Sequence, residues 1–111
     1  METAGNIVRE FYAAIVNRDM AKARSYLADD MVYHGIFKML PSAVFQSFMG
    51  FTTRLDGQAG ENAAIFYEME TTKPAHAVTF AGEWHQVRGG KIVSARAACD
   101  GRPFAALFPA P

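Results

Sequence analysis

The first third of the chain repeats its hydrophobic residues with the period of an amphipathic helix. The repeated positions are Ile7, Val8, Phe11, Ala14 and Ile15. This spacing predicts a helix of about three turns, with Thr3 or Asn6 as its amino-terminal cap. The polar segment Asn17–Asp19 interrupts the pattern, and Asp19 is suited to cap a second helix that continues through Leu27.

The middle of the chain contains a predicted strand followed by a predicted third helix. Residues Met31–Phe37 alternate as a strand requires, and both of its faces are rather apolar. Pro41 then stands like a first helical residue, and hydrophobic residues recur every three or four positions as far as Leu55. This helix would carry a broad aromatic stripe made by Phe45, Phe48 and Phe51.

The second half of the chain contains three predicted strands joined by short turns. They run over Ala63–Thr71, His76–Val87 and Lys91–Asp100. Thr72–Pro74 closes the first two into a hairpin, and the paired glycines Gly89 and Gly90 supply the positive φ angles of a tight hairpin turn. Pro103 can start a short final turn, Phe104–Phe108, that closes over the sheet.

This order of elements, ααβαβββ, predicts an α+β fold. Strands that follow one another through hairpins form an antiparallel sheet, since parallel pairing needs a crossover between each pair. We therefore expect one curved antiparallel sheet wrapped around helices on one face, within a single domain of residues 1–111. Half of the residues are hydrophobic and a fifth are charged, as in a compact globular protein.

The charge balance and the cysteine count limit the classes of function. Eleven basic residues match eleven acidic ones, so nothing in the charge favours a nucleic acid or an anionic membrane as partner. Cys99 is the only cysteine, and neither a secretory leader nor a membrane-spanning run stands out, so we expect a cytoplasmic protein. The excess of aromatic and methionine side chains suits a core or an apolar pocket.

Three segments together resemble the SnoaL-like and ketosteroid isomerase-like members of the nuclear transport factor 2-like superfamily. They are Val8–Asp19, Leu27–Gly35 and Val87–Ser94, and they span most of the chain. The resemblance implies a cone-shaped SnoaL-like domain with a deep pocket between sheet and helices, and a homodimer formed through the outer sheet face. Functions in this superfamily range from isomerases, cyclases, dehydratases and epoxide hydrolases to binding proteins, so the fold leaves the function open.

The catalytic residues of these relatives carry over only in part. The isomerase general base would fall near His34 or Gly35, and the tyrosine of the first helix falls at Phe11, with Tyr12 beside it. The second oxyanion donor of the isomerases matches Glu83 when the strands are aligned through the glycine turn. The Asp-Arg-Asp set of the epoxide hydrolases is absent, since only Glu83, Arg96 and Asp100 could imitate it and their spacing differs.

Glu83 and His85 are the main candidates for chemistry because they lie two residues apart and so project from the same face of a strand. Facing the pocket, they would be partly neutral near pH 7 and able to move protons. The alternative places them in solvent, because Val78, Phe80 and Trp84 on the other face compete for the interior. A bulge at Gly82 would let both sets point inward.

Other residues are weaker candidates for the site. His34 is a further possible base, and any of the four tyrosines could donate a hydrogen bond to a ligand carbonyl. We expect the ligand to be contacted by Tyr33, Phe11, Phe48, Trp84 and Cys99. Arg96 and Asp100 are expected to point outward. The histidine spacing does not suit a metal, and no phosphate-binding loop indicates a nucleotide cofactor.

Two hypotheses follow from these residues. In the first, a small apolar molecule with a carbonyl or epoxide binds in the pocket, and Glu83, His85 or His34 moves a proton without a cofactor. In the second, the chain is a non-catalytic homodimer that binds a hydrophobic ligand or partner. They differ in one feature, because catalysis needs at least two titratable groups converging inside the pocket.

Overall fold

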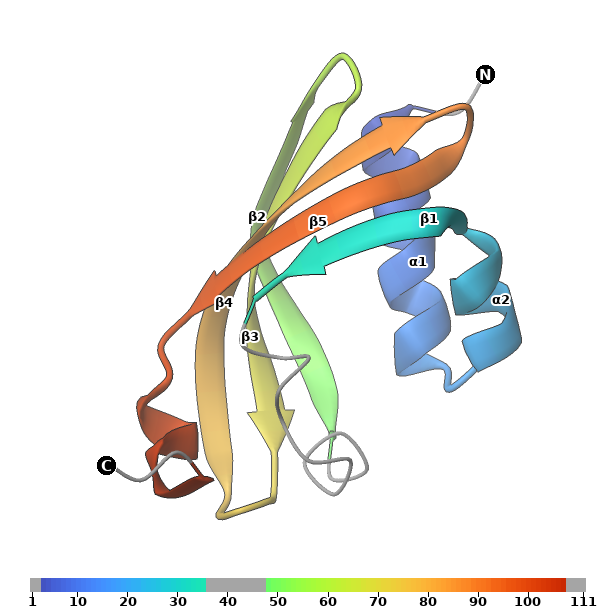
Figure 1. The fold of residues 1–111 in the computed structure, drawn as a ribbon. Helices are drawn as coiled ribbons and strands as arrows, with labels where there is room; N and C mark the ends of the chain where they lie inside the picture. The colour runs from blue at the N-terminus through green and yellow to red at the C-terminus, as the bar shows by residue number, and fades with distance from the viewer. Residues whose placement is uncertain (1–2, 36–47, 108–111) are drawn as a thin grey trace.

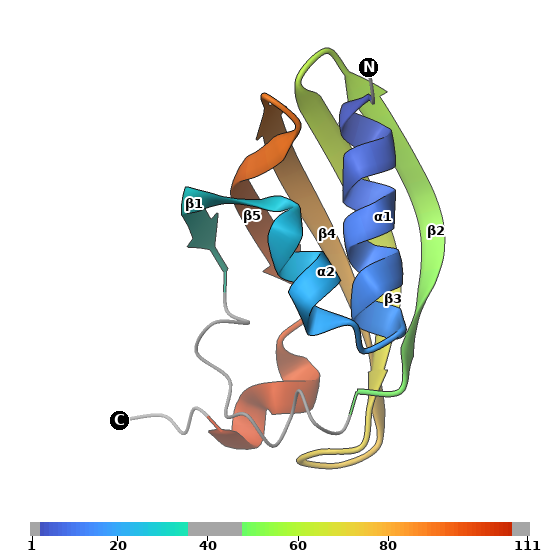
Figure 2. The ribbon, with the colours of Figure 1, turned by 90° about the vertical axis from the view of Figure 1, so that its right-hand side faces the viewer.

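The computed structural model describes residues 3–35 and 48–107. Two helices come first, followed by five strands and a closing 3-10 helix. Their bounds are α1 Ala4–Val16, α2 Met20–Ser25, β1 Leu27–His34, β2 Gly50–Ala59, β3 Asn62–Thr71, β4 Ala77–Arg88, β5 Lys91–Cys99 and η2 Arg102–Leu107. The strands form one open, twisted sheet that curves around α1, with α1 and α2 on the same side of it (Figures 1 and 2). The predicted α+β class is confirmed.

The sheet is mixed rather than wholly antiparallel. Its strand order is β1-β5-β4-β3-β2, and every neighbouring pair is antiparallel except β1 with β5. The prediction of an all-antiparallel sheet is therefore wrong at one edge. The reason is that the chain between β1 and β5 contains three other strands, which supplies the long connection that parallel pairing needs.

Both helices begin where short polar side chains cap them. The hydroxyl of Thr3 accepts a hydrogen bond from the Asn6 amide at 3.2 Å, and the carboxylate of Asp19 accepts one from the Lys22 amide at 3.1 Å. These caps match the predicted helix starts. The second helix ends at Ser25, before the predicted end at Leu27, because Leu27 already pairs with β5 as the first residue of β1.

The predicted third helix is wrong in its last part. Residues 50–55 belong to strand β2, which pairs with β3 from Gly50 to Ala59, and the rest of the predicted helix up to residue 47 lies outside the described residues. Hydrophobic residues of this stretch fit a helical period, but a run of β-branched and aromatic residues also suits a strand, and pairing with β3 decides the outcome. The described residues form five strands, where the sequence predicts four.

Alternation along β3 and β4 builds the core. Every second residue of β3 from Ala63 to Thr71 is buried, and the same holds for β4 from Thr79 to Val87. The hairpin between β4 and β5 turns through Gly89 and Gly90 at φ angles of 60° and 78°, as predicted. The 3-10 helix η2 buries Phe104 completely against this core. Within the described residues, no helix is long and apolar enough to span a bilayer.

Gly82 does not form the predicted bulge. Its pairing with Phe66 and Ala98 continues the regular register, and the irregularity of β4 falls between Gln86 and Val87 instead. The glycine serves a different purpose, because an added Cβ would lie 2.7 Å from the Phe66 ring on the outer face. Since no bulge switches the faces of β4 at this point, its residues keep strict alternation through Glu83 and His85.

Candidate functional site

Strand β4 carries its acidic and imidazole side chains on the face that packs against α1. Glu83 is 9% exposed and His85 is 2% exposed, whereas Phe80 and Trp84 are 52% and 46% exposed on the opposite face. Because side chains alternate regularly along β4, Glu83 and His85 point inside. The aromatic residues Phe80 and Trp84 therefore point outside. Buried groups of this kind are stable only when they have partners.

Four side chains from three elements form a buried polar cluster. Tyr67 on β3 donates a hydrogen bond to Oε2 of Glu83. Nε2 of His85 lies 3.3 Å from Oε1 of Glu83 and 3.3 Å from the hydroxyl oxygen of Tyr12, which α1 brings from 73 residues away in the sequence. We call Tyr12, Tyr67, Glu83 and His85 the buried cluster. It joins α1 to strands β3 and β4 of the sheet.

The partners of Glu83 keep its carboxylate ionised. Burial raises the pKa of Glu83, but hydrogen bonds from His85, Tyr67 and Tyr12 outweigh burial and leave the pKa below that of an ordinary glutamate. Burial, followed by the charge of Glu83, raises the pKa values of Tyr12 and Tyr67 well above those of ordinary tyrosines. Both phenols therefore remain hydrogen-bond donors to a negative carboxylate.

This arrangement assigns the hydrogen of a neutral His85 ring to Nε2. A carboxylate only accepts hydrogen bonds, so a lone pair on Nε2 would face another acceptor at 3.3 Å. With its hydrogen on Nε2, the ring keeps a lone pair on Nδ1. That atom is buried and has no hydrogen-bond partner among the described residues. The cluster thus satisfies its carboxylate and leaves Nδ1 of His85 without a partner among the described residues.

Aromatic rings surround the imidazole and limit where another molecule can approach it. Tyr12 meets the His85 ring edge-on at 5.8 Å between centroids, and Phe11 lies 6.5 Å away on the same helix. Tyr33 on β1 pairs with Ala95, which pairs with His85, so Tyr33 and His85 lie in one row across the sheet. At the ordinary strand spacing their backbones are about 10 Å apart. Ala95, the residue between them in the row, is itself buried.

The remaining predicted ligand contacts are placed in different parts of the molecule. Phe48 is buried in the core, where the guanidinium of Arg18 lies 5.5 Å from its ring centroid. Cys99 is half-buried beside the core, and burial followed by the charges of Asp100 and Glu83 raises the pKa of its thiol. A thiol with a raised pKa is a poor nucleophile, which favours a structural role.

Two predicted residues do not join the site. Trp84 points to the outer face, where its indole nitrogen donates to Asn62 at 2.9 Å and Arg96 stacks on its ring. The structure thus places Trp84 away from the buried cluster, and its contact with a ligand stays a prediction. His34 is exposed and pairs with Arg96 in the outer-facing row, so β1 places it on the opposite face from His85. Arg96 itself is exposed, as predicted.

The tyrosines of the cluster could be found in the sequence only as members of a larger set. The resemblance to the superfamily aligns the first-helix tyrosine of the isomerases with Phe11. The residue that contacts His85 is Tyr12, one position later. Tyr67 alternates with other buried residues of β3, and nothing in its own segment distinguishes it from an ordinary core tyrosine. The signal is the register, which sets Tyr67 opposite Ala81 and thus diagonal to Glu83.

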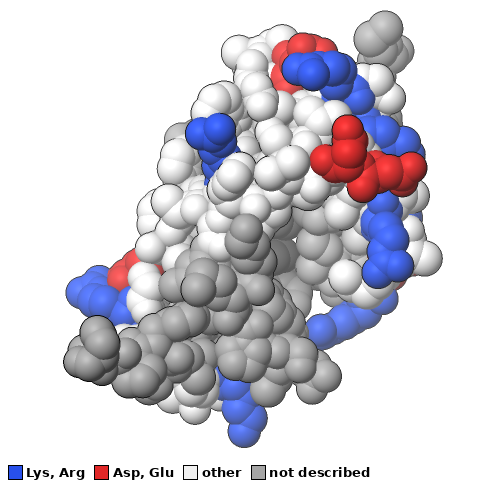
Figure 3. Space-filling view, in the orientation of Figure 1, with Lys and Arg blue, Asp and Glu red and all other residues white. Residues whose placement is uncertain are grey.

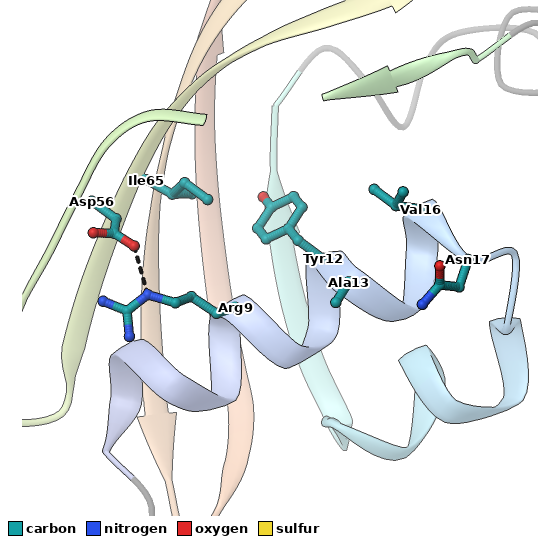
Figure 4. Close-up of a pocket in the computed structure, with 7 residues that line it drawn as sticks. All are labelled: Arg9, Tyr12, Ala13, Val16, Asn17, Asp56 and Ile65. Carbon is teal, nitrogen blue, oxygen red and sulfur yellow. Dashed lines mark hydrogen bonds and ion pairs between the residues drawn. The ribbon is translucent and has the colours of Figure 1, made fainter. Parts of the chain in front are cut away.

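A cleft opens between α1 and the sheet on the side of β2. Its volume is about 470 Å³, and its described lining consists of Arg9, Tyr12, Ala13, Val16, Asn17, Asp56 and Ile65. Figure 4 shows Ile65 beside Tyr12, with the ion pair between Arg9 and Asp56 at one end and Val16 and Asn17 at the other. Tyr12 belongs to both features, since its ring lines the cleft and its hydroxyl reaches His85.

The site has no arrangement suited to a metal ion in the described part of the chain. No three histidine, cysteine, aspartate or glutamate side chains gather closely enough there to hold one. Buried polar atoms without partners do occur elsewhere on the inner face. Besides Nδ1 of His85, the hydroxyls of Thr71 and Thr79 are buried and have no partner among residues 3–35 and 48–107.

Comparison with known proteins identifies the fold. No family model and no curated protein matches the sequence. A cystatin-like protein of Xanthomonas campestris shares 16% identity over 98% of this chain and 100% of its own, with a TM-score of 0.81. A nuclear transport factor 2-like protein of Burkholderia pseudomallei shares 16% identity over 99% of this chain and 100% of its own, with a TM-score of 0.76. An epoxide hydrolase-like protein of M. tuberculosis shares 19% identity over 89% of this chain and 84% of its own, with a TM-score of 0.70.

Proposed function

We propose that this chain, which has the nuclear transport factor 2-like fold, binds a small apolar molecule and moves a proton on it without a cofactor, with His85 as the base. The observation that carries the proposal is the buried Nδ1 of His85, which has no partner among the described residues while Nε2 faces Glu83. Bases in active sites are commonly held in this way, with one nitrogen oriented by a carboxylate and the other directed to the substrate.

The proposed step is proton removal from a carbon next to a carbonyl group. Nδ1 of His85 takes the proton, and the electron pair of the broken C–H bond forms an enolate whose negative charge resides on the carbonyl oxygen. Glu83 compensates the charge of the resulting imidazolium, and the hydroxyls of Tyr12 and Tyr67 hold that carboxylate in place. Where a carbon–carbon double bond next to that carbon extends the enolate to a dienolate, return of the proton to the far carbon moves the double bond and gives isomerisation. We assign Tyr33, in the same row, as donor to the carbonyl oxygen.

The fold neighbours support an interior that holds small organic molecules. The M. tuberculosis protein described above is named as an epoxide hydrolase, and related chemistry in this chain would let His85 activate water for attack on an epoxide. The interior offers only one carboxylate in the cluster, Glu83, which favours one base with an orienting carboxylate over a set of two acids. Carbonyl substrates therefore suit the site better than epoxides.

Hydrogen exchange of a simple ketone in D₂O tests the proposal. Cyclohexanone is incubated with the protein, and deuterium incorporation next to its carbonyl is followed by NMR. The His85→Gln variant should lose about 100- to 10,000-fold of the rate above buffer, the contribution expected of a positioned base. His76→Gln is the matched control, because His76 is exposed and paired with Glu70.

The alternative of a non-catalytic binding protein makes the opposite prediction. If the wild-type protein binds cyclohexanone yet exchanges it no faster than His85→Gln does, the buried cluster is structural and the acid-base proposal is rejected. The self-contained hydrogen bonding of Glu83 favours this alternative, because its carboxylate already has donors from the protein. Binding without exchange would leave the fold and its apolar interior as the functional features.

We also propose that two copies of the chain associate through the outer sheet face. Phe66 and Phe80 stack there at 6.3 Å between centroids, and Val78 and Trp84 are exposed beside them. Figure 3 shows Lys and Arg (blue) and Asp and Glu (red) in separate small groups on the face in view. An exposed patch of large apolar side chains on a twisted sheet marks an interaction surface. A second copy offers a self-complementary face.

A further inference from the structure

One face of α1 is covered by the core only at Tyr12, and its other residues are partly or largely exposed. Arg9, Tyr12, Ala13, Val16 and Asn17 recur at intervals of three and four residues, so they form a single stripe along the helix. The stripe and Ile65 of β3 line the cleft of about 470 Å³ described above (Figure 4). Val16 is 46% exposed there, which is unusual for a valine on a helix that packs on a sheet.

The charges of this cleft neutralise each other. Nε of Arg9 lies 2.7 Å from Oδ2 of Asp56, and a second nitrogen of the same guanidinium donates to Asn6 at 2.9 Å. An ionic ligand would find its opposite charge already paired and would lose its hydration on entry. An uncharged ligand has no such cost.

The two ends of the cleft differ from its middle. Tyr12, Ala13, Val16 and Ile65 present mainly carbon, and the amide of Asn17 lies at the end opposite the ion pair, where it offers one donor and one acceptor (Figure 4). The volume falls within the range of small-molecule pockets, toward its lower end. This lining suits a ring-sized apolar body that carries one carbonyl or hydroxyl group.

We infer that the cleft between α1 and the sheet is a binding site for a small uncharged molecule with an apolar body and a single polar group. The site is formed by the stripe on α1 together with Ile65. It is separate from the proposed base, because His85 does not line the cleft. The two share only Tyr12, whose ring is a wall of the cleft and whose hydroxyl contacts His85. An occupant of the cleft therefore lies against the ring that helps to hold the buried cluster.

Methyl NMR with a defined pair of probes tests this site. Cyclohexanone should produce saturable shifts of the Val16 and Ile65 methyl signals, while those of Val87 and Ile92, which do not line the cleft, stay in place. Cyclohexanecarboxylate has a similar ring and a negative charge, and it should bind at least about tenfold more weakly. Shifts that are absent, or that spread evenly over all four residues, would overturn the inference.

A substitution that fills the cleft is the second test of the site. Ala13 is exposed on α1, so Ala13→Leu should be accommodated by the helix and should weaken cyclohexanone binding at least about tenfold. Ala21→Leu is the matched control at an exposed position of α2, and it should bind like the wild type. Equal binding by the Ala13→Leu variant would contradict the site. His85→Gln should keep cleft binding, so retained methyl shifts together with ketone exchange as fast as in the wild type would reject the proposed base alone.

Discussion

The two faces of β4 reverse the usual distribution of polar and apolar side chains. Toward α1 the strand presents Glu83 and His85, both buried, and away from α1 it presents Phe80 and Trp84, both about half exposed. A strand in an ordinary sandwich of sheet and helix would have its aromatic residues inside. The reversal is stable on the inner side because Glu83 and His85 have hydrogen-bond partners there.

The two faces of β4 differ in the role we propose for them, since the inner face carries the candidate base and the outer face the candidate dimer surface. The inner face pays a desolvation cost that Tyr12 and Tyr67 offset through hydrogen bonds to Glu83. The outer face leaves apolar area in water, which association would remove. Changes on one face should therefore alter the stability and chemistry of a protomer, whereas changes on the other should alter the assembly.

The largest expected effect comes from removing the carboxylate of the inner face. Glu83→Ala would leave Tyr67, Tyr12 and the Nε2 hydrogen of His85 buried without their acceptor. We expect the free energy of unfolding to fall by roughly 3 to 5 kcal/mol, measured by urea denaturation.

The matched control is another glutamate whose ion pair is exposed. Glu61 lies 3.6 Å from Arg88 at the surface, and Glu61→Ala should change the free energy of unfolding by less than about 1 kcal/mol. If the free energy of unfolding fell by a similar amount in Glu83→Ala and Glu61→Ala, the buried cluster would stabilise the fold no more than an exposed ion pair does. The contrast between the two faces of β4 would then have no energetic basis.

An intermediate effect is expected on the outer face. Phe80→Glu introduces a charge beside Phe66 and should weaken dimerisation by about 2 kcal/mol, or roughly 30-fold, with little change in the fold of a protomer. Sedimentation equilibrium measures it. Met20→Glu is the control, since Met20 is as exposed on α2 but away from the sheet face. A wild-type protein that is monomeric at all concentrations would refute the proposed dimer.

The pH dependence of stability should report the inner face. Because the pKa of Glu83 is lower in the folded than in the unfolded protein, its contribution is complete above its ordinary value of 4.5 and is lost as the pH falls below it. The effect should be smaller than that of Glu83→Ala, since a protonated carboxyl still occupies the site. Urea denaturation at several pH values checks this, and Glu83→Gln should lose that component of the acid dependence.

The smallest expected effect concerns an inner-face hydroxyl without a partner. Thr79 is fully buried and its hydroxyl has no partner among the described residues. Thr79→Val keeps the shape of the side chain and removes the unsatisfied group, so the free energy of unfolding should stay the same or rise by about 1 kcal/mol. Tyr67→Phe, which removes a hydroxyl that donates to Glu83, should lower it. Thermal unfolding of both variants distinguishes satisfied from unsatisfied hydroxyls.

The sequence predicts where most of the strands and turns lie better than it predicts which strands pair and which faces are buried. Gly89 and Gly90 determine their turn locally, and alternation along β4 places Glu83 and His85 on a common face. Which face is buried depends on α1 and on the pairing with β3, and neither is written in the β4 segment. The parallel pairing of β1 escapes prediction for the same reason, since it joins residues about 60 positions apart.

Residues 50–55 show how tertiary pairing overrides a local period. Their hydrophobic spacing fits a helix, yet they lie opposite β3 and take the strand form. The site shows the same limit, because Tyr12 and Tyr67 look like ordinary core residues until the register brings them to Glu83. Residue types on β4 indicate the chemistry, and long-range packing supplies the partners that make it workable.

The tautomer of His85 tests the central claim most directly. Long-range nitrogen-proton NMR of ¹⁵N-histidine-labelled protein distinguishes the two ring nitrogens above the pH at which the ring is protonated. The structure predicts a hydrogen on Nε2 and a bare Nδ1, and Glu83→Gln should weaken that preference. A hydrogen on Nδ1 in the wild-type protein would mean that the base we assign is blocked, and it would contradict the account.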